Sequence, residues 1–142
     1  MPKVSRKAEV CHPALKMLSL VQQVDKYSEF VPACVEGRVV MQGEGFIHAR
    51  LAFAKGNVKQ AFTTKNTVYA ADKVVMELVD GPFKVLYGEW TFRPLAQGCE
   101  VGFELEFEFS NIMFKMMFQP LFKQLAAELL QAFCRRADAV YG

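Results

Sequence analysis

The chain between residues 34 and 111 alternates apolar and polar residues in six separate runs. The clearest run is 103–109, FELEFEF, in which phenylalanine and leucine fall on one side and three glutamates on the other. Because successive side chains of a β-strand point to opposite faces, this alternation predicts a strand with one buried face. The other five runs, separated by short turn signals, are 34–42, 46–55, 58–69, 73–79 and 84–92. Together they predict an antiparallel meander with one face toward water.

The N-terminal part of the chain has a different organisation. Residues 3–10 alternate well enough to predict a first strand, although Arg6 interrupts its apolar side. Residues 14–24 then place apolar side chains at helical spacing, directly after a proline that suits a first helical turn. A second short helix is predicted over 25–30, with Asp25 as its N-cap. The apolar stripe of the first helix consists of Leu15, Met17, Leu18, Val21 and Val24.

The C-terminal segment from Ile112 to about Val140 predicts one long helix, capped by Ser110 or Asn111. Pro120 predicts a kink near residues 116–117 or a later start of the regular helix. The helix carries a broad, bulky apolar stripe that needs a large apolar partner, and the inner face of the sheet supplies one. We therefore expect an α+β fold over 1–142, a single domain. In this fold a curved antiparallel sheet of six to seven strands wraps around the long C-terminal helix.

Composition adds a surplus of adaptable apolar side chains. Hydrophobic residues make up 52% of the 142 residues, with 13 phenylalanines and 7 methionines. Such a composition suits either an apolar binding site or a plain core. The net charge of +2, without a basic run, predicts no DNA binding and leaves weak contact with RNA or transient contact with a membrane surface open. The N-terminal residues form no signal peptide and no segment is apolar enough to span a bilayer, so a cytoplasmic location is expected.

Candidate catalytic or metal-binding groups are few. The two histidines, His12 and His48, fall on different elements without an obvious acidic or cysteine partner, and no C-x-x-C motif occurs. The glutamates of 103–109 are expected to face solvent, with Arg93, Lys65 and Lys59 as cross-strand partners. We therefore expect no catalytic residue, no metal site and no required cofactor. The protein is interpreted as a non-enzyme. The four cysteines, expected to be reduced thiols, are Cys11, Cys34, Cys99 and Cys134.

Thr64 and Asn66 are the polar residues of most interest, because they share a predicted strand face with the inward-pointing Phe62. A polar group on such a face needs a hydrogen-bond partner. That partner is either a nearby backbone group or the polar head of a ligand. Phe83, in the turn after 80–82, is interpreted as a local plug, as part of a gate, or as an apolar patch that contacts a membrane or a partner. The other residues expected to line the interior, as core or as ligand contacts, are Met76, Leu78, Leu86, Trp90, Phe92, Phe107, Phe109, Met117, Leu121 and Leu125.

Several short motifs, in this order and spacing, resemble one known family. They are Y-x-x-F-x-P-x-C at 27–34, F-T-T-K-N at 62–66, L-V-D-G-P-F at 78–83, G-E-W-T-F-R-P-L at 88–95, F-E-F-S-N at 107–111 and A-F-x-x-R-A at 132–137. The sequence resembles the START-like (helix-grip) superfamily, of the polyketide cyclase/dehydrase type. Within it, the resemblance is to the family of the ribosome association toxin RatA and the coenzyme Q-binding START proteins.

The resemblance implies an elongated hydrophobic cavity between the sheet and the C-terminal helix. It also implies a lipophilic ligand, with ubiquinone as the leading candidate, and so a carrier that supports respiratory electron transport. The alternative is a ribosome association toxin-like factor that binds the large ribosomal subunit and hinders subunit association. A third interpretation, a polyketide cyclase or aromatase, needs an acid–base residue inside the cavity, which Asn66 cannot supply.

Overall fold

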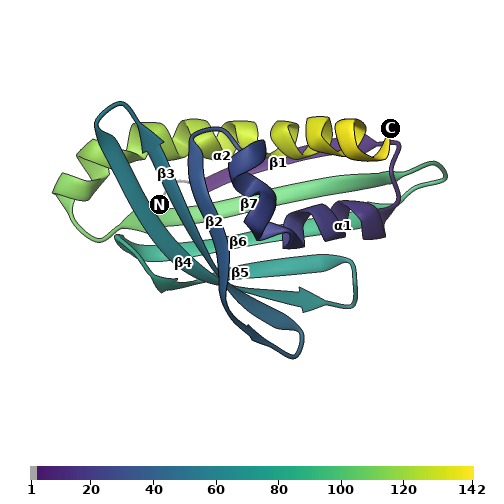
Figure 1. The fold of residues 1–142 in the computed structure, drawn as a ribbon, viewed down its shortest axis with the longest axis horizontal. Coiled ribbons are helices and arrows are strands. Elements are labelled where there is room, and N and C mark those ends of the chain that lie inside the picture. Colours follow the sequence, from purple (N-terminus) through teal and green to yellow (C-terminus); the bar gives the residue numbers. More distant parts are fainter. Residues whose placement is uncertain (1–2) are drawn as a thin grey trace.

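The computed structural model describes residues 3–142 and forms a curved sheet with a long helix along it (Figure 1). In chain order the elements are β1 (Lys3–Val10), α1 (Ala14–Gln22), the 3-10 helix η1 (Val24–Glu29), β2 (Cys34–Gly43), β3 (Phe46–Lys55), β4 (Val58–Tyr69), β5 (Lys73–Asp80), β6 (Phe83–Pro94), β7 (Cys99–Phe109) and α2 (Ile112–Tyr141). The predicted order of elements and the α+β class are therefore confirmed.

The described strands form one sheet in the order β1-β7-β6-β5-β4-β3-β2, with every neighbouring pair antiparallel. Strands β2 to β7 follow one another as the predicted meander, and β1 adds to the edge beside β7. Figure 1 shows β2, β3 and β4 running steeply across β6 and β7, with α2 along the sheet. This strong twist gives the sheet a concave face that α2 covers.

The alternation in β7 decides which side chains meet α2. Phe103, Phe107 and Phe109 are buried, whereas Glu104 is exposed. The Phe107 ring packs edge-on against Phe122 of α2, with 4.7 Å between ring centroids. The predicted contact between the phenylalanine face of this strand and the long helix is thus confirmed.

Two expectations for the N-terminal helices are wrong. Leu15 is largely exposed, while the neighbouring Met17 and Leu18 are buried. Two residues correspond to about 200° around an α-helix, so Leu15 points away from the face that Met17 occupies. Asp25 is not an N-cap, because η1 starts at Val24 and its N-cap position is Gln23. The Gln23 N–H already donates to the α1 carbonyls of Ser19 and Leu20, so η1 continues directly from α1.

The long helix α2 begins where the sequence placed its cap. The Asn111 side chain accepts a hydrogen bond from the Phe114 N–H at 2.9 Å. The helix continues through Pro120, which has no N–H to donate to the Met116 carbonyl. Figure 1 shows the first turns of α2 at an angle to the rest of the helix, as expected for a proline kink.

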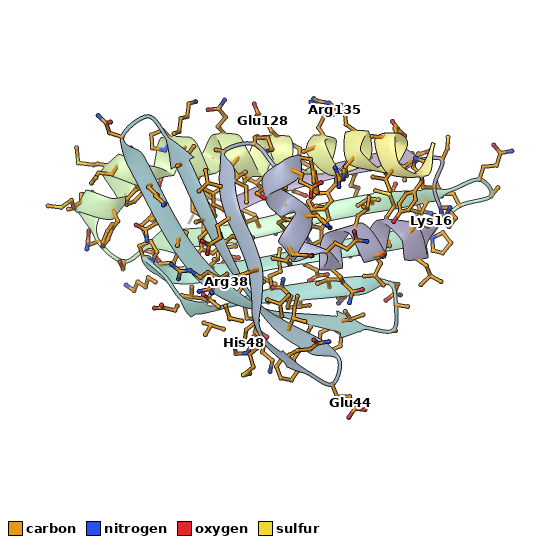
Figure 2. The ribbon with its side chains drawn as sticks, in the orientation of Figure 1. Lys16, Arg38, Glu44, His48, Glu128 and Arg135 are labelled. Carbon is orange, nitrogen blue, oxygen red and sulfur yellow. The ribbon has the colours of Figure 1, made fainter. Side chains whose placement is uncertain are left out.

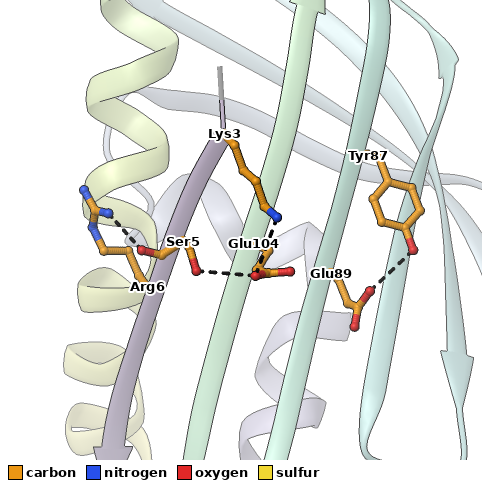
Figure 3. A network of polar contacts seen from close by, with 6 residues as sticks. All are labelled: Lys3, Ser5, Arg6, Tyr87, Glu89 and Glu104. Carbon is orange, nitrogen blue, oxygen red and sulfur yellow. Dashed lines mark hydrogen bonds and ion pairs between the residues drawn. The ribbon is translucent and has the colours of Figure 1, made fainter. Parts of the chain in front are cut away.

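The predicted cross-strand partners of the β7 glutamates are wrong. Glu104 lies 4.0 Å from the Lys3 ammonium group and accepts a hydrogen bond from Ser5 at 3.5 Å (Figure 3). Both partners come from β1, which pairs directly with β7. Lys59 and Lys65 lie on β4, which is separated from β7 by β6 and β5. The partners of the glutamates therefore depend on the order of strands in the sheet, which alternation alone does not determine.

Arg93 also pairs elsewhere, because the β6–β7 register places it opposite Glu100. Their ion pair is 3.2 Å long. The hydrogen bond from Arg93 lowers the pKa of the Glu100 carboxyl below its ordinary value. On the same outer face the Tyr87 hydroxyl donates to Glu89 at 3.4 Å (Figure 3). Over β1, β6 and β7, the convex face of the sheet thus carries a network of polar contacts.

Candidate functional site

A cavity of about 60 Å³ lies between the concave face of the sheet and α2. We call it the central cavity. It is lined almost entirely by apolar side chains from five strands and α2, with Tyr27 of η1 and Val31 at one side. The lining residues are Tyr27, Val31, Leu51, Phe53, Phe62, Thr64, Asn66, Met76, Leu86, Gly88, Trp90, Phe103, Leu105, Phe122, Leu125, Ala126, Leu129 and Phe133.

Thr64 and Asn66 are the polar pair of the central cavity. They stand two residues apart on β4, so both side chains point to the concave face. Both are buried, and the Thr64 hydroxyl donates to the Asn66 side-chain oxygen at 2.6 Å. The hydrogen-bond partner, expected to be either a backbone group or a ligand head group, is for Thr64 the side chain of Asn66. With its oxygen accepting from Thr64, Asn66 has its amide N–H groups left as donors, and it lines both the central cavity and a surface pocket beside Gln42 and Ile47.

Tyr27 brings a further polar group to the lining, but its hydroxyl is already engaged in a hydrogen bond. Its hydroxyl donates to the Val21 carbonyl of α1. Burial raises the pKa of the Tyr27 phenol far above its ordinary value, so the group stays neutral and protonated. Its ring packs edge-on against Phe133 at 5.3 Å between centroids. Tyr27 thus holds η1 against α1 and α2 and presents its ring to the cavity.

The structure brings together about half of the interior residues expected from the sequence. The expected residues that line the central cavity are Phe62, Thr64, Asn66, Met76, Leu86, Trp90 and Leu125. Phe83, Phe109 and Leu121 instead line a smaller pocket of about 20 Å³ nearer the start of α2. Phe62 and Leu125 contribute to both, so the two spaces are neighbours along one apolar interior.

Four expected residues lie outside both spaces. Met117 is half exposed, because the adjacent Phe118 takes the inward-facing position on α2. Phe92 and Phe107 are almost completely buried within the core, and Phe107 is covered by the Phe122 ring. Leu78 is partly buried against the core without reaching either lining.

Sequence reasoning missed several lining residues for identifiable reasons. Phe103 and Leu105 share the apolar face of 103–109 and could have been found by that alternation. Ala126 and Phe133 belong to the same helix stripe as Leu125, and their faces could also have been inferred. Gly88 carries no such signal. A Cβ on Gly88 would lie 2.4 Å from the Met76 methyl group, so this glycine leaves space for the Met76 side chain.

His12 has an acidic partner that the sequence did not reveal. Its Nε2 lies 2.8 Å from an Asp138 carboxylate oxygen, and its ring is buried near Tyr141. The contact joins the segment after β1 to the last turns of α2, away from the central cavity. Over residues 3–142, no group of three or more His, Cys, Asp or Glu side chains could hold a metal ion.

The buried thiols are poor nucleophiles. Burial raises the pKa of Cys34 to about 11. Burial also raises the pKa of Cys99 and of Cys134. Because the thiolate is the reactive form of cysteine, these groups are almost wholly protonated at neutral pH.

A separate surface groove of about 620 Å³ runs along the outer side of α2 beside Phe30 and Pro32. Figure 2 shows Glu128 and Arg135, two of its lining residues, on the side of α2 that points away from the sheet. Arg136, also in the groove, forms a 2.9 Å ion pair with Glu29 and stacks 5.0 Å above the Phe30 ring. The groove is therefore an open surface feature lined by both charged and apolar residues, unlike the central cavity.

A sheet gripping a long C-terminal helix around an apolar cavity defines the helix-grip, START-like class. The sequence matches the family described as polyketide cyclase/dehydrase and lipid transport over residues 10–134, and the chain belongs to this family. It is 41% identical to the ribosome association toxin RatA of Escherichia coli K12, over 99% of this chain and 90% of that protein. It is 28% identical to the mitochondrial coenzyme Q-binding protein of Drosophila melanogaster, over 77% of this chain and 47% of that protein.

Solved structures agree on the fold. A protein from Thermus thermophilus superposes with a TM-score of 0.84 at 18% identity, covering 99% of this chain and all of that one. The Zhui aromatase/cyclase from Streptomyces sp. R1128 superposes with a TM-score of 0.83 at 16% identity, covering 96% of this chain and 93% of that one. A search of the described helices found none with the length and apolarity needed to cross a membrane.

Proposed function

We propose that this protein binds a hydrophobic small molecule, a ubiquinone-type quinone or another lipid, in the central cavity. The observation that carries the proposal is the lining itself: an apolar surface with one polar pair, Thr64 and Asn66, inside it. Such a lining gives affinity through apolar burial and orientation through a few hydrogen bonds. A carrier of this kind would support respiratory electron transport by delivering quinone.

Asn66 is the residue proposed to recognise the ligand. Its oxygen accepts from Thr64, so its N–H groups are oriented to donate. A quinone carbonyl is an acceptor that fits these donors. Among the lining residues, Tyr27 alone has an ionisable side chain, and its hydroxyl already donates to Val21. Because acid–base catalysis needs a group that can exchange a proton near neutral pH, we propose binding without catalysis.

The size of the central cavity determines how a ligand enters. A volume of about 60 Å³ compares with roughly 300–1,000 Å³ for typical small-molecule sites. A quinone ring therefore requires side chains to rearrange and α2 to separate further from the sheet. Met76 and Leu129 are partly buried lining residues with flexible side chains, and we expect them to move first.

The first test is organic extraction of the protein purified from cells, followed by mass spectrometry of the extract. A stoichiometric quinone or lipid supports the proposal. Added short-chain ubiquinone should also quench the fluorescence of Trp90, which is the single tryptophan and lines the cavity. A protein that carries no such molecule and also fails to take up added quinone would contradict the proposal.

A matched pair of variants locates the binding. Ala126 is buried in the cavity lining, and its neighbour Ala127 is exposed on the other side of α2. Ala126→Phe should fill the cavity and abolish the quenching of Trp90 fluorescence by quinone. The fluorescence of Ala127→Phe should be quenched as in the unmodified protein. Circular dichroism establishes that both variants fold. If Ala126→Phe folds and still binds with unchanged affinity, the ligand lies elsewhere.

The second candidate function is ribosome binding that hinders subunit association. The observation that favours it is the 41% identity to RatA over nearly the full length of both chains. Arg135, exposed in the outer groove, is a candidate for a phosphate contact. Co-sedimentation with large ribosomal subunits should fall with salt and fall further for Arg135→Glu, with Lys7→Glu on the edge strand β1 as the control. Absence of co-sedimentation at low salt removes this candidate.

A further inference from the structure

The first two turns of α2 expose four large apolar side chains. Ile112 is 68% exposed, Met113 67%, Met116 75% and Met117 51%. We call these four residues the apolar tip. Figure 1 shows these turns projecting past the ends of the strands at one end of the molecule. A contiguous exposed apolar group of this kind marks an interaction site in a folded protein.

The exposure follows from regular helical geometry. The helix is capped by Asn111 and is hydrogen-bonded from its first turn. Phe118 turns toward the interior, and Phe114 stacks on it at 5.8 Å between centroids. These two phenylalanines already supply the side that packs on the protein. The apolar tip is therefore a second apolar face, which the described part of the chain leaves uncovered.

The charges around the tip indicate the kind of surface it meets. Between residues 110 and 127 the sequence has two lysines, Lys115 and Lys123, and no acidic residue. Lys84 is exposed at the start of β6, and Lys55 reaches α2 through a 3.0 Å hydrogen bond to Gln124. The nearby acidic residues are Asp80 at the end of β5, Glu108 on the outer face of β7 and Glu128, which accepts a 3.5 Å hydrogen bond from Gln124. Apolar side chains flanked by lysines fit a membrane surface with anionic lipids.

The tip also adjoins the interior. Phe118 follows directly after it and lines the smaller pocket, together with Phe83 and Phe109. That pocket shares Phe62 and Phe122 with the central cavity. A lipid surface at the tip would thus lie beside the apolar interior, so that a ligand could pass between them with little exposure to water.

We propose that the apolar tip docks this protein on the surface of an anionic lipid membrane. The proposal rests on the proposed function, because it supplies the contact through which a lipophilic ligand is exchanged. The aliphatic and thioether groups of the tip enter the interfacial region of the bilayer, and Lys84, Lys115 and Lys123 face the lipid phosphates.

The test is flotation of the unmodified protein with vesicles of phosphatidylcholine, with and without phosphatidylglycerol. We expect binding to the mixed vesicles that weakens with salt and is smaller on phosphatidylcholine alone. The variant Met113→Gln/Met116→Gln should lower the partition constant by about tenfold, because it removes apolar side chains from the inserted face. Leu15→Gln, at an equally exposed leucine on α1, is the matched control and should bind like the unmodified protein.

Three results would overturn the proposal. The unmodified protein could fail to float, the double variant could float equally well, or sedimentation equilibrium could show a dimer that the double variant abolishes. The last result assigns the tip to a second copy of the chain. Quenching of Trp90 by short-chain ubiquinone, measured without vesicles, separates the two proposals. Flotation without quenching contradicts the cavity function alone, and quenching without flotation contradicts the docking alone.

Discussion

Both parts of α2 carry large apolar side chains, but in opposite surroundings. In residues 112–117, four of six side chains are large apolar groups that are at least half exposed. From Phe118 to Phe133 the large apolar side chains are buried or partly buried, and Phe133 is fully buried between Tyr27, Phe30 and Trp90. The difference shows that burial depends on whether the sheet lies beneath the helix as well as on the sequence of the helix.

The hydrophobic side chains of the two parts therefore have different roles. The C-terminal part covers the concave face and closes the central cavity, so its side chains contribute to stability and to the candidate site at once. The apolar tip stays largely exposed after folding and remains available for a partner. Substitutions in the C-terminal part should therefore lower the unfolding free energy, whereas substitutions in the apolar tip should leave it nearly unchanged. The predictions below run from the largest expected effect to the smallest.

The largest effect is expected for Phe133→Ala. Phe133 is completely buried and packs edge-on against the Trp90 ring at 5.0 Å between centroids. Removing a buried aromatic ring costs about 3–5 kcal/mol of unfolding free energy, since it leaves a cavity. Urea denaturation followed by Trp90 fluorescence measures this loss. A change below about 1 kcal/mol would contradict the packing described for this part of α2.

The next largest effect is expected at the polar pair under the C-terminal part. Asn66→Leu leaves the Thr64 hydroxyl buried without its acceptor, which costs about 1–3 kcal/mol. The double variant Thr64→Val/Asn66→Leu removes both polar groups and should be more stable than Asn66→Leu alone. Urea titrations of the three proteins form the comparison. Equal stability of the single and double variants would show that the Thr64 hydroxyl finds another partner.

A smaller, local effect is expected for Asn111→Ala at the start of the helix. Loss of the N-cap bond to the Phe114 N–H costs about 1 kcal/mol of helix stability. Because the apolar tip is not packed on the sheet, this loss should appear as faster amide hydrogen exchange at residues 114–117. Exchange in the C-terminal part should be unchanged. Ser110→Ala is the control, and identical exchange in both variants would argue against the cap.

The smallest effect is expected for Met116→Gln in the apolar tip. An exposed side chain without packing partners changes the unfolding free energy by less than about 0.5 kcal/mol. Thermal unfolding should therefore coincide with that of the unmodified protein and of Leu15→Gln. A clearly lower midpoint would mean that the tip is packed on the protein in solution, and the contrast between the two parts of α2 would disappear.

Much of the architecture was predictable because it depends on local periodicity. Alternation in 103–109 identified β7 and its buried face, and the helix cap, Asn111, was one of the two residues predicted for it. Leu15 was misplaced because an apolar residue in a helix does not reveal which face meets a partner. The partner of Glu104 was missed because β1, distant in the sequence, pairs with β7.

The candidate site was predictable only in its chemical character. Phe62, Thr64 and Asn66 could be placed on one inward face from the two-residue period of β4. The hydrogen bond between Thr64 and Asn66 depends on side-chain rotamers that no pattern specifies. Met117 was expected inside and lies outside, because the phase of α2 is set by the packing of Phe118 and Phe122.

By itself, the sequence determined the elements, their order and the buried face of the strands, since these follow from periods of 2 and about 3.6 residues. The tertiary structure alone decided the volume of the central cavity, the His12–Asp138 contact and the exposure of the apolar tip. These features depend on how far the sheet curves and where α2 lies upon it. They arise from packing between residues distant in the chain, which local periodicity does not encode.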